Sequence, residues 1–137
     1  MKRNSRLSLA LHTLSHMAGD PSRTRTSADI AAHAGTNPVV VRRVLGPLRE
    51  AGRLFSEIGL SGGWRLARAP QDITLADVYL ALEERLVATA ELEEAPSCSV
   101  EYALQKRVTA VLEEIEENLV KRLRETSIAE MCRPEHH

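Results

Sequence analysis

The sequence is poor in cysteine and has no long apolar run, and each fact excludes a class of protein. Cys98 and Cys132 are the only cysteines in 137 residues, too few for a disulfide framework. No apolar run approaches the length of a membrane span, and the apolar stretch near the start is interrupted by polar residues and two histidines. We therefore expect a cytoplasmic protein with no membrane association.

The chain also lacks the residue patterns that are typical of an active site. It has no nucleophile paired with a base, no glycine-rich loop that would hold a phosphate and no pair of carboxylates at a spacing that indicates catalysis. Its composition, 43% hydrophobic and 27% charged, is that of a folded domain. We expect a binding protein and not an enzyme.

The net charge of −1 conceals two halves of opposite sign. Residues 1–69 contain eleven basic and four acidic side chains, a balance of +7. Residues 70–137 contain seven basic and fifteen acidic side chains, a balance of −8. A basic half favours contact with a polyanion, although two differently charged solvated faces would give the same numbers.

Three short helices separated by turns are predicted before residue 53. Apolar residues repeat at helical spacing over residues 5–18. Thr26 suits the cap of a second helix, which Gly35 would end. Asn37 can cap a third helix, and Pro38 suits its first position. Two short helices joined by a tight turn that begins with glycine form the helix-turn-helix pattern.

A hairpin and a fourth helix follow. Residues 54–59 and 64–68 are β-like, with Gly62 and Gly63 at the bend between them. Three helices followed by a hairpin indicate a winged helix-turn-helix. Thr74 is placed to cap the fourth helix.

A long helix is predicted from Ser99, where a run free of glycine and proline begins. Its apolar residues recur at steps of three and four, which suits packing against another long helix. A second copy of the chain would cover this seam in an antiparallel or crossed homodimer; the alternative is a helix folded back on its own domain. The seam residues are Leu104, Val108, Val111, Leu112, Ile115, Leu119 and Leu123.

The predicted fold is therefore mainly α with a small β wing. It comprises a winged helix-turn-helix DNA-binding domain in residues 1–82, a connector or sensor loop in residues 83–98, and a dimerisation helix and tail in residues 99–137.

Several motifs in order resemble the Rrf2 family of bacterial winged helix-turn-helix transcription regulators. They are TSADIA, NPVVVRRVL, LREAG, GGWRLAR and ITLADVY, and the similarity covers nearly the whole chain. The resemblance implies a homodimer that binds an imperfect palindrome in a promoter, usually as a repressor. The alternative is a protein-interaction module, in which the winged helix and the acidic half dock a protein instead of DNA.

Duplex DNA would meet the basic half, with the third helix entering the major groove. Val41, Leu45 and Leu48 should face the core of the domain. The family's wing commonly has Arg-Gly before its glycine turn, whereas this chain has Ile58-Gly59. The residues expected at DNA are Lys2, Arg3, Arg6, Thr26, Ser27, Asn37, Val39, Val40, Arg42, Arg43, Ser61, Gly62, Gly63 and Arg65.

Many members of the family bind an iron–sulfur cluster through three cysteines before the long helix. Here only Cys98 matches, so no cofactor is expected and the chain resembles the clusterless branch. Cys98 at a helix start is either a candidate sensor of an oxidant or effector, alone or with Cys132, or a buried small residue.

His12 and His16 share a helix face but have no third ligand nearby in the sequence, so we predict no metal site.

Overall fold

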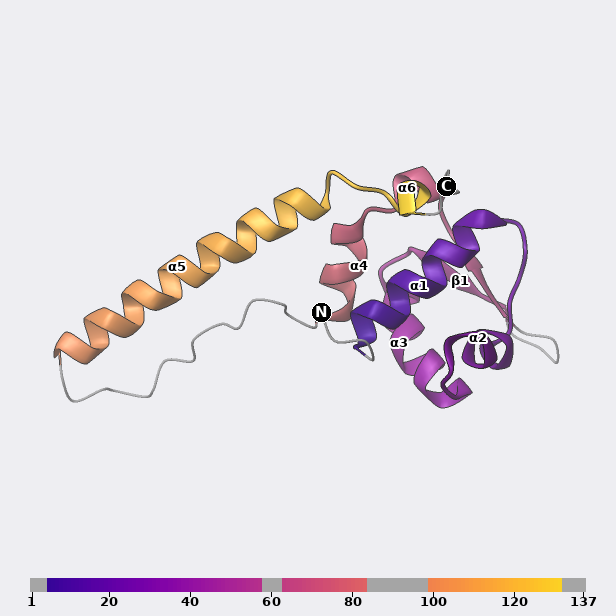
Figure 1. Ribbon diagram of the computed structural model, residues 1–137, viewed down its shortest axis with the longest axis horizontal. Coiled ribbons are helices and arrows are strands. Elements are labelled where there is room, and N and C mark those ends of the chain that lie inside the picture. The colour runs from indigo at the N-terminus through magenta and orange to yellow at the C-terminus, as the bar shows by residue number, and fades with distance from the viewer. Residues whose placement is uncertain (1–4, 58–62, 84–98, 132–137) are drawn as a thin grey trace, which may run out of the picture.

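The computed structural model describes residues 5–57, 63–83 and 99–131. Their elements follow one another in the order of a winged helix with a long helical extension (Figure 1). They are α1 (Arg6–Gly19), α2 (Ser27–Ala34), α3 (Pro38–Glu50), β1 (Leu54–Ser56), β2 (Trp64–Leu66), the 3₁₀ turn η1 (Pro70–Asp72), α4 (Leu75–Leu82), α5 (Ser99–Leu123) and α6 (Ile128–Met131). The predicted fold class, mainly α with a small β wing, is confirmed.

Helix α1 is the central element of the domain and contacts α2, α3, α4, α6 and β2. Ser5 caps it by accepting a hydrogen bond from the Ser8 backbone N–H at 3.0 Å. Its apolar stripe, which includes Leu14 and Met17, is buried. Because residues at this spacing share one helix face, a single stripe joins the other elements into one core.

Local sequence signals set the limits of α2 and α3. Thr26 caps α2 in a reciprocal capping box with Asp29, and Gly35 ends it in the left-handed conformation at φ 73°. Asn37 then caps α3 through the Val40 backbone N–H at 3.1 Å. α2 and α3 pack on one another across this turn, as the helix-turn-helix pattern predicts.

Strands β1 and β2 form the base of the wing. They are antiparallel, with Leu54 opposite Leu66 and Phe55 opposite Arg65. Leu54 and Trp64 face the core, whereas Phe55 and Arg65 are exposed. This alternation is that of a strand pair with one buried face.

The segment after α5 returns to the N-terminal domain. The Leu75 backbone N–H donates to the Thr126 carbonyl and the Ile128 N–H donates to the Ile73 carbonyl, each at 2.9 Å. The Ile128 side chain is fully buried, and α6 packs against α1. The hydrophobic core is therefore not confined to residues 1–82, the range that we predicted for the DNA-binding domain.

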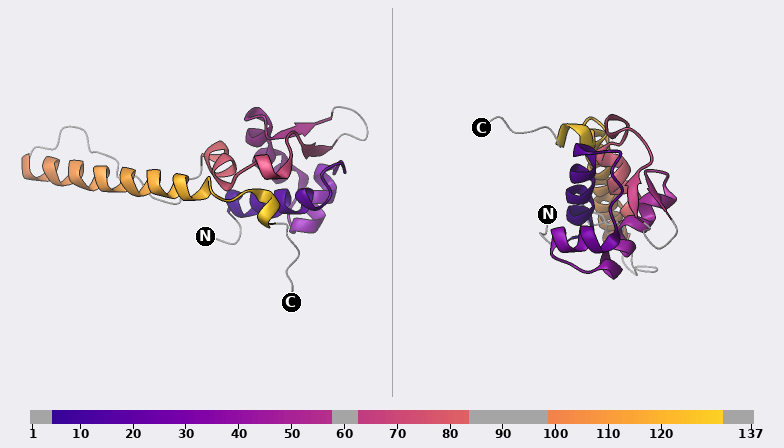
Figure 2. Two further views of the ribbon diagram at one scale, coloured as in Figure 1. Left: turned by 90° about the horizontal axis from the view of Figure 1, so that it is seen from above. Right: turned by 90° about the vertical axis from the view of Figure 1, so that its right-hand side faces the viewer.

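Helix α5 projects away from the domain, and only its C-terminal end meets it (Figures 1 and 2). Leu119, Val120 and Leu123 pack against the core, and the buried Tyr79 hydroxyl donates to the Glu116 carboxylate. No residue of α5 is fully buried. Among the helices in the described ranges, none has the length and apolar character to cross a membrane.

Asp77 joins α4 to the turn between α3 and β1. It completes a capping box with Thr74 and accepts a hydrogen bond from the Arg53 guanidinium at 3.1 Å. Burial raises the pKa of the Asp77 carboxyl, but the hydrogen bonds from Arg53 and the Thr74 backbone outweigh burial, so its pKa is lowered overall. The ionised carboxylate is the form that the fold stabilises.

We predict that Asp77→Asn lowers the free energy of unfolding by roughly 1–3 kcal/mol, because it removes a charge-assisted bond and weakens a helix cap. Chemical denaturation at pH 7 measures this. Glu57→Gln is the matched control: Glu57 lies 4.0 Å from Arg65 with both side chains exposed, so the change should be below about 0.5 kcal/mol.

A comparison of wild type with Asp77→Asn at different pH values gives a test with a defined sign. A carboxyl whose pKa is lower in the folded state stabilises the fold above its unfolded pKa of about 3.9, and this contribution is lost as pH falls through the folded pKa. The stability gap between wild type and Asp77→Asn should therefore be constant near neutrality and shrink below about pH 4. A gap that widens on acidification would contradict this role.

Candidate nucleic-acid interface

The exposed face of α3 carries two neighbouring arginines. Arg42 and Arg43 are exposed, and neither forms an ion pair or hydrogen bond with a side chain in the part of the chain that the structure describes. Val39 precedes them with 55% of its surface exposed, and Asn37 is also exposed at the cap. α3 thus presents a small apolar patch and two available cations near its N-terminal end.

The opposite face of α3 holds the helix in the domain. Val41, Leu45 and Leu48 are buried as predicted, and Val44 is buried beside them. Val40 differs from our expectation of an outward-facing residue: it is half-buried and packs against the core. Val39 is therefore the valine that α3 offers most openly.

Two hydroxyls lie at the start of α2, where helix N–H groups point outward. The Thr26 Oγ1 accepts from the Asp29 backbone N–H at 3.0 Å, and the Ser27 Oγ accepts from the Trp64 indole N–H at 2.9 Å. Because both oxygens act as acceptors, each O–H proton remains able to donate to a phosphate oxygen.

A backbone bridge ties the segment before α2 to the wing. The Trp64 N–H donates to the Arg25 carbonyl at 2.7 Å, and the Arg25 N–H donates to the Trp64 carbonyl at 3.0 Å. The Arg25 guanidinium also donates to the His16 carbonyl on α1 at 3.1 Å. The start of α2, the wing and α1 therefore hold fixed positions relative to one another.

Gly63 allows this bridge to form. A Cβ at this position would lie 2.5 Å from the Thr24 Cγ2 and 2.9 Å from the Arg25 carbonyl oxygen. We had placed Gly63 among the DNA-contacting residues; it is buried at the base of the wing, where its lack of a side chain lets β2 approach the Arg25 segment.

Arg65 is the exposed cation of β2. Its guanidinium lies 5.0 Å from the centre of the Phe55 ring and 4.0 Å from the Glu57 carboxylate. Arg6 is exposed at the first residue of α1. Of the other expected contacts, Lys2, Arg3, Ser61 and Gly62 lie outside the described residues, as does the sensor candidate Cys98.

The expected dimerisation residues divide between two environments along α5. Leu104, Val108, Val111 and Ile115 are 40–62% exposed. Leu112 is partly exposed, whereas Leu119 and Leu123 pack against the core of their own domain. The apolar surface available to a partner is therefore concentrated on the projecting part of the helix.

The sequence did not point to Arg25, Arg49 or His33. Arg49 donates to the Ser56 hydroxyl at 3.2 Å and lies 5.8 Å from the Trp64 ring centre, which links the end of α3 to the wing. His33 lies beside the His12 and His16 pair, which the sequence left without a third ligand. These contacts join residues far apart in the chain, so no local pattern indicates them.

Comparisons with known proteins agree with this geometry. The family model described as Rrf2, iron-dependent transcriptional regulator, matches residues 3–134. YwnA of Bacillus subtilis (strain 168), a candidate HTH-type transcriptional regulator, is 35% identical over 131 residues, which cover 93% of this chain and 95% of YwnA.

Solved structures show the same fold. The crystal structure of a candidate DNA-binding protein matches with a TM-score of 0.75 and 32% identity, covering 93% of this chain and 99% of the other. CymR, the global cysteine regulator of B. subtilis, matches with a TM-score of 0.64 over 96% of each chain; at 21% identity this likeness concerns the fold alone.

We predict that Gly63→Ala destabilises the protein by roughly 1–3 kcal/mol, because the new methyl group would overlap Thr24 and the Arg25 carbonyl. Chemical denaturation measures the change. Gly46→Ala is the control: apart from its chain neighbours, nothing lies within 4 Å of a Cβ there. The helix preference of alanine and its unfavourable position before Pro47 act in opposite directions, so the change in stability should stay below about 1 kcal/mol. Equal effects at the two glycines would contradict the close approach at Gly63.

Proposed function

This chain belongs to the Rrf2 family of transcription regulators, and we propose that it acts as a homodimer that binds a palindromic promoter site and represses transcription. The observation that carries the proposal is the exposed face of α3, where Arg42, Arg43 and Val39 are presented by the second helix of a helix-turn-helix. In this fold that helix enters the major groove with its N-terminal turns leading.

The chemistry of this face suits a duplex. An arginine can bond guanine bidentately or hold a phosphate, and a valine methyl can contact a thymine methyl. The hydroxyls and N–H groups at the start of α2 suit phosphate oxygens, which would fix the orientation of the protein. Exposed Arg65 on the wing can add a contact to the backbone. The family and the relatives favour DNA over the protein-docking alternative.

The two halves of α5 support the homodimer. Its C-terminal end is held by the domain, so the projecting part has a fixed direction. In that part Leu104 is 62% exposed, Val108 49% and Ile115 47%. Exposure of this apolar stripe to water is unfavourable, so burial against a partner would stabilise it. A second copy of the helix offers the same stripe in return, as two-fold interfaces require.

The family description names iron, but this chain has too few cysteines to hold it as a conventional iron–sulfur cluster. Such clusters are held by several cysteine thiolates, usually four. The chain contains only Cys98 and Cys132, separated by the whole of α5, and both lie outside the described residues. We assign no step in the proposed function to an iron–sulfur cluster, and none to a catalytic reaction.

We predict that Arg42→Ala and Arg43→Ala each weaken binding to duplex DNA. An arginine that holds only phosphate should reduce the slope of log affinity against log salt by about 1 on a mixed-sequence duplex. An arginine that reads a base should cost about 1–3 kcal/mol at one position of a preferred site. Fluorescence anisotropy across a salt series measures both quantities.

Arg107→Ala is the control for this experiment, because Arg107 is also an exposed arginine but lies on α5. It should leave both affinity and salt slope unchanged. Wild-type protein that shows no salt-dependent affinity for duplex would favour the protein-docking alternative. Loss of binding in Arg107→Ala but not in the α3 variants would place the interface elsewhere.

A second prediction concerns assembly. Val108→Glu puts a charge into the proposed helix–helix contact and should raise the dimer dissociation constant at least about tenfold. Lys106→Glu adds the same side chain on the opposite face of α5 and should leave the dimer intact. Sedimentation velocity over a concentration series measures the change. Equal assembly of Val108→Glu and wild type would remove α5 from the dimer contact.

A further inference from the structure

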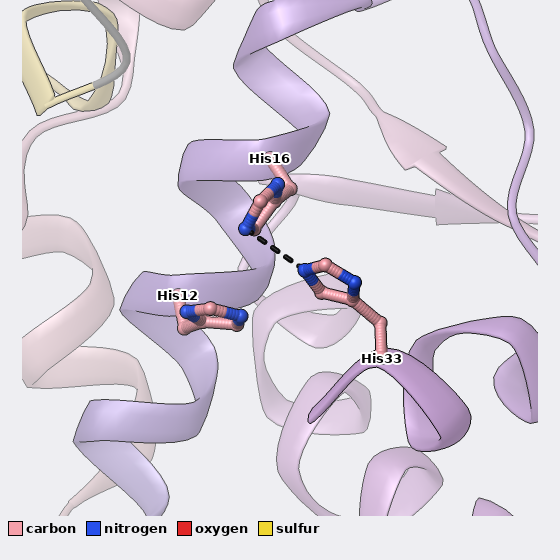
Figure 3. Close-up of side chains that lie close together, drawn as sticks. All are labelled: His12, His16 and His33. Carbon is pink, nitrogen blue, oxygen red and sulfur yellow. Dashed lines mark hydrogen bonds between the residues drawn. The ribbon is translucent and has the colours of Figure 1, made fainter. Parts of the chain in front are cut away.

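Three histidine side chains meet on the surface between α1 and α2. His12 and His16 lie one turn apart on α1, and His33 reaches them from the last turn of α2 (Figure 3). One ring nitrogen from each residue can be chosen so that all three lie within 4.8 Å of one another. The Nε2 atoms of His16 and His33 are 3.0 Å apart.

The spacing of these nitrogens is close to that of a metal site. Zinc binds imidazole nitrogen at about 2.0–2.1 Å with tetrahedral geometry, which places two ligand nitrogens roughly 3.3 Å apart. The three histidines are exposed, so their rings have room to rotate toward this distance. The pair at i and i+4 on one helix, with a third ligand from a second helix, gives three ligands on one side of an ion.

Within the described ranges, the only hydrogen bond of the three rings is the one between His16 and His33, which a bound ion would replace. No carboxylate in the described ranges hydrogen bonds to any of the three imidazoles, so no hydrogen-bonded anion favours the protonated form of these rings. Burial lowers the pKa of His16, and the nearby His33, His12 and Arg25 charges lower it further. The neutral ring, which has a lone pair for a metal, is therefore the favoured form at His16.

A hollow of about 630 Å³ in front of the rings gives an ion access from solvent. Arg23 and Arg25 line it and oppose a positive ion, whereas the Asp29 carboxylate on the same wall offsets part of their charge. Because three protein ligands leave one tetrahedral position open, a water or another small ligand can complete the coordination.

We propose that His12, His16 and His33 form a binding site for one divalent transition-metal ion, with Zn²⁺ as the representative ion. A set of imidazole ligands without thiolates suits zinc, copper and nickel, and it is distinct from a cysteine-held cluster. The site itself does not depend on the proposed DNA function.

The position of the site gives the ion a structural consequence. His33 lies two residues before Gly35, where α2 ends and the chain turns into α3. A bound ion would connect α1 to α2 immediately before that turn, and would restrict the direction in which α3 is presented. Bound Zn²⁺ should therefore raise the thermal midpoint of unfolding. It should also increase the affinity of the protein for duplex DNA, an expectation that rests on the proposed function.

Isothermal titration of Zn²⁺ into the full metal-free chain tests the site. We expect one ion per chain. Loss of a residue that only supports a ligand typically weakens metal binding about 10–100-fold. His16→Ala and His33→Ala each remove a ligand itself, so each should weaken Zn²⁺ binding by at least that factor. His12→Ala should show the same effect. Because all three residues are exposed and alanine favours helices, thermal melting without metal should confirm that the variants fold.

Two control variants separate this site from other donors in the sequence. His136→Ala/His137→Ala and Cys98→Ser/Cys132→Ser should each retain wild-type Zn²⁺ binding. Unchanged binding in His33→Ala, or loss of binding in either control, would overturn the proposal. DNA affinity is measured separately with and without Zn²⁺: an ion that binds at the three histidines without changing DNA affinity would refute only the link to DNA, and leave the metal site established.

Discussion

The mutual backbone bridge between Arg25 and Trp64 determines how the parts of the domain are placed. The two N–H···O bonds, at 2.7 and 3.0 Å, join the segment before α2 to the wing, and the Trp64 indole reaches the first residue of α2. The Arg25 side chain extends the connection to α1. Since α3 packs on α2 across a short turn, its orientation follows from the same bridge. The bridge thereby limits the movement of the basic face of α3, and this reduces the entropy lost on binding.

The returning C-terminal segment links this domain to the long helix. Ile128 lies in the core, and the backbone bonds to Ile73 and Leu75 fix the path of the chain after α5. The helix is anchored at one end and projects from the domain (Figure 2). Its exposed apolar side chains lie toward the other end. If two copies join through the projecting part, the separation of their α3 helices is determined by the anchored ends. A fixed separation between recognition helices is what a palindromic site requires.

The sequence predicted the parts of the fold that depend on neighbouring residues. Thr26, Asn37 and Thr74 cap helices as expected, and Gly35 ends α2, because each signal acts within one turn of the chain. The strand pair was predicted from two β-like runs with glycines between them. The sequence did not predict that Val40 packs against the core, because this residue lies at the border of the buried stripe of α3. Ile128 in the core, Gly63 against Arg25 and His33 beside His16 depend on contacts between distant residues, which periodicity does not report.

We propose that two copies of α3, held at a fixed separation, read DNA sequence. Selection of bound sites from a pool of random duplexes by the full-length protein tests it most directly. We expect enrichment of an inverted repeat whose half-sites lie about one helical turn, roughly 10 base pairs, apart, or a multiple of that distance. Enrichment of a single unpaired half-site would contradict the dimer, and recovery of DNA with no sequence preference would contradict sequence reading by α3.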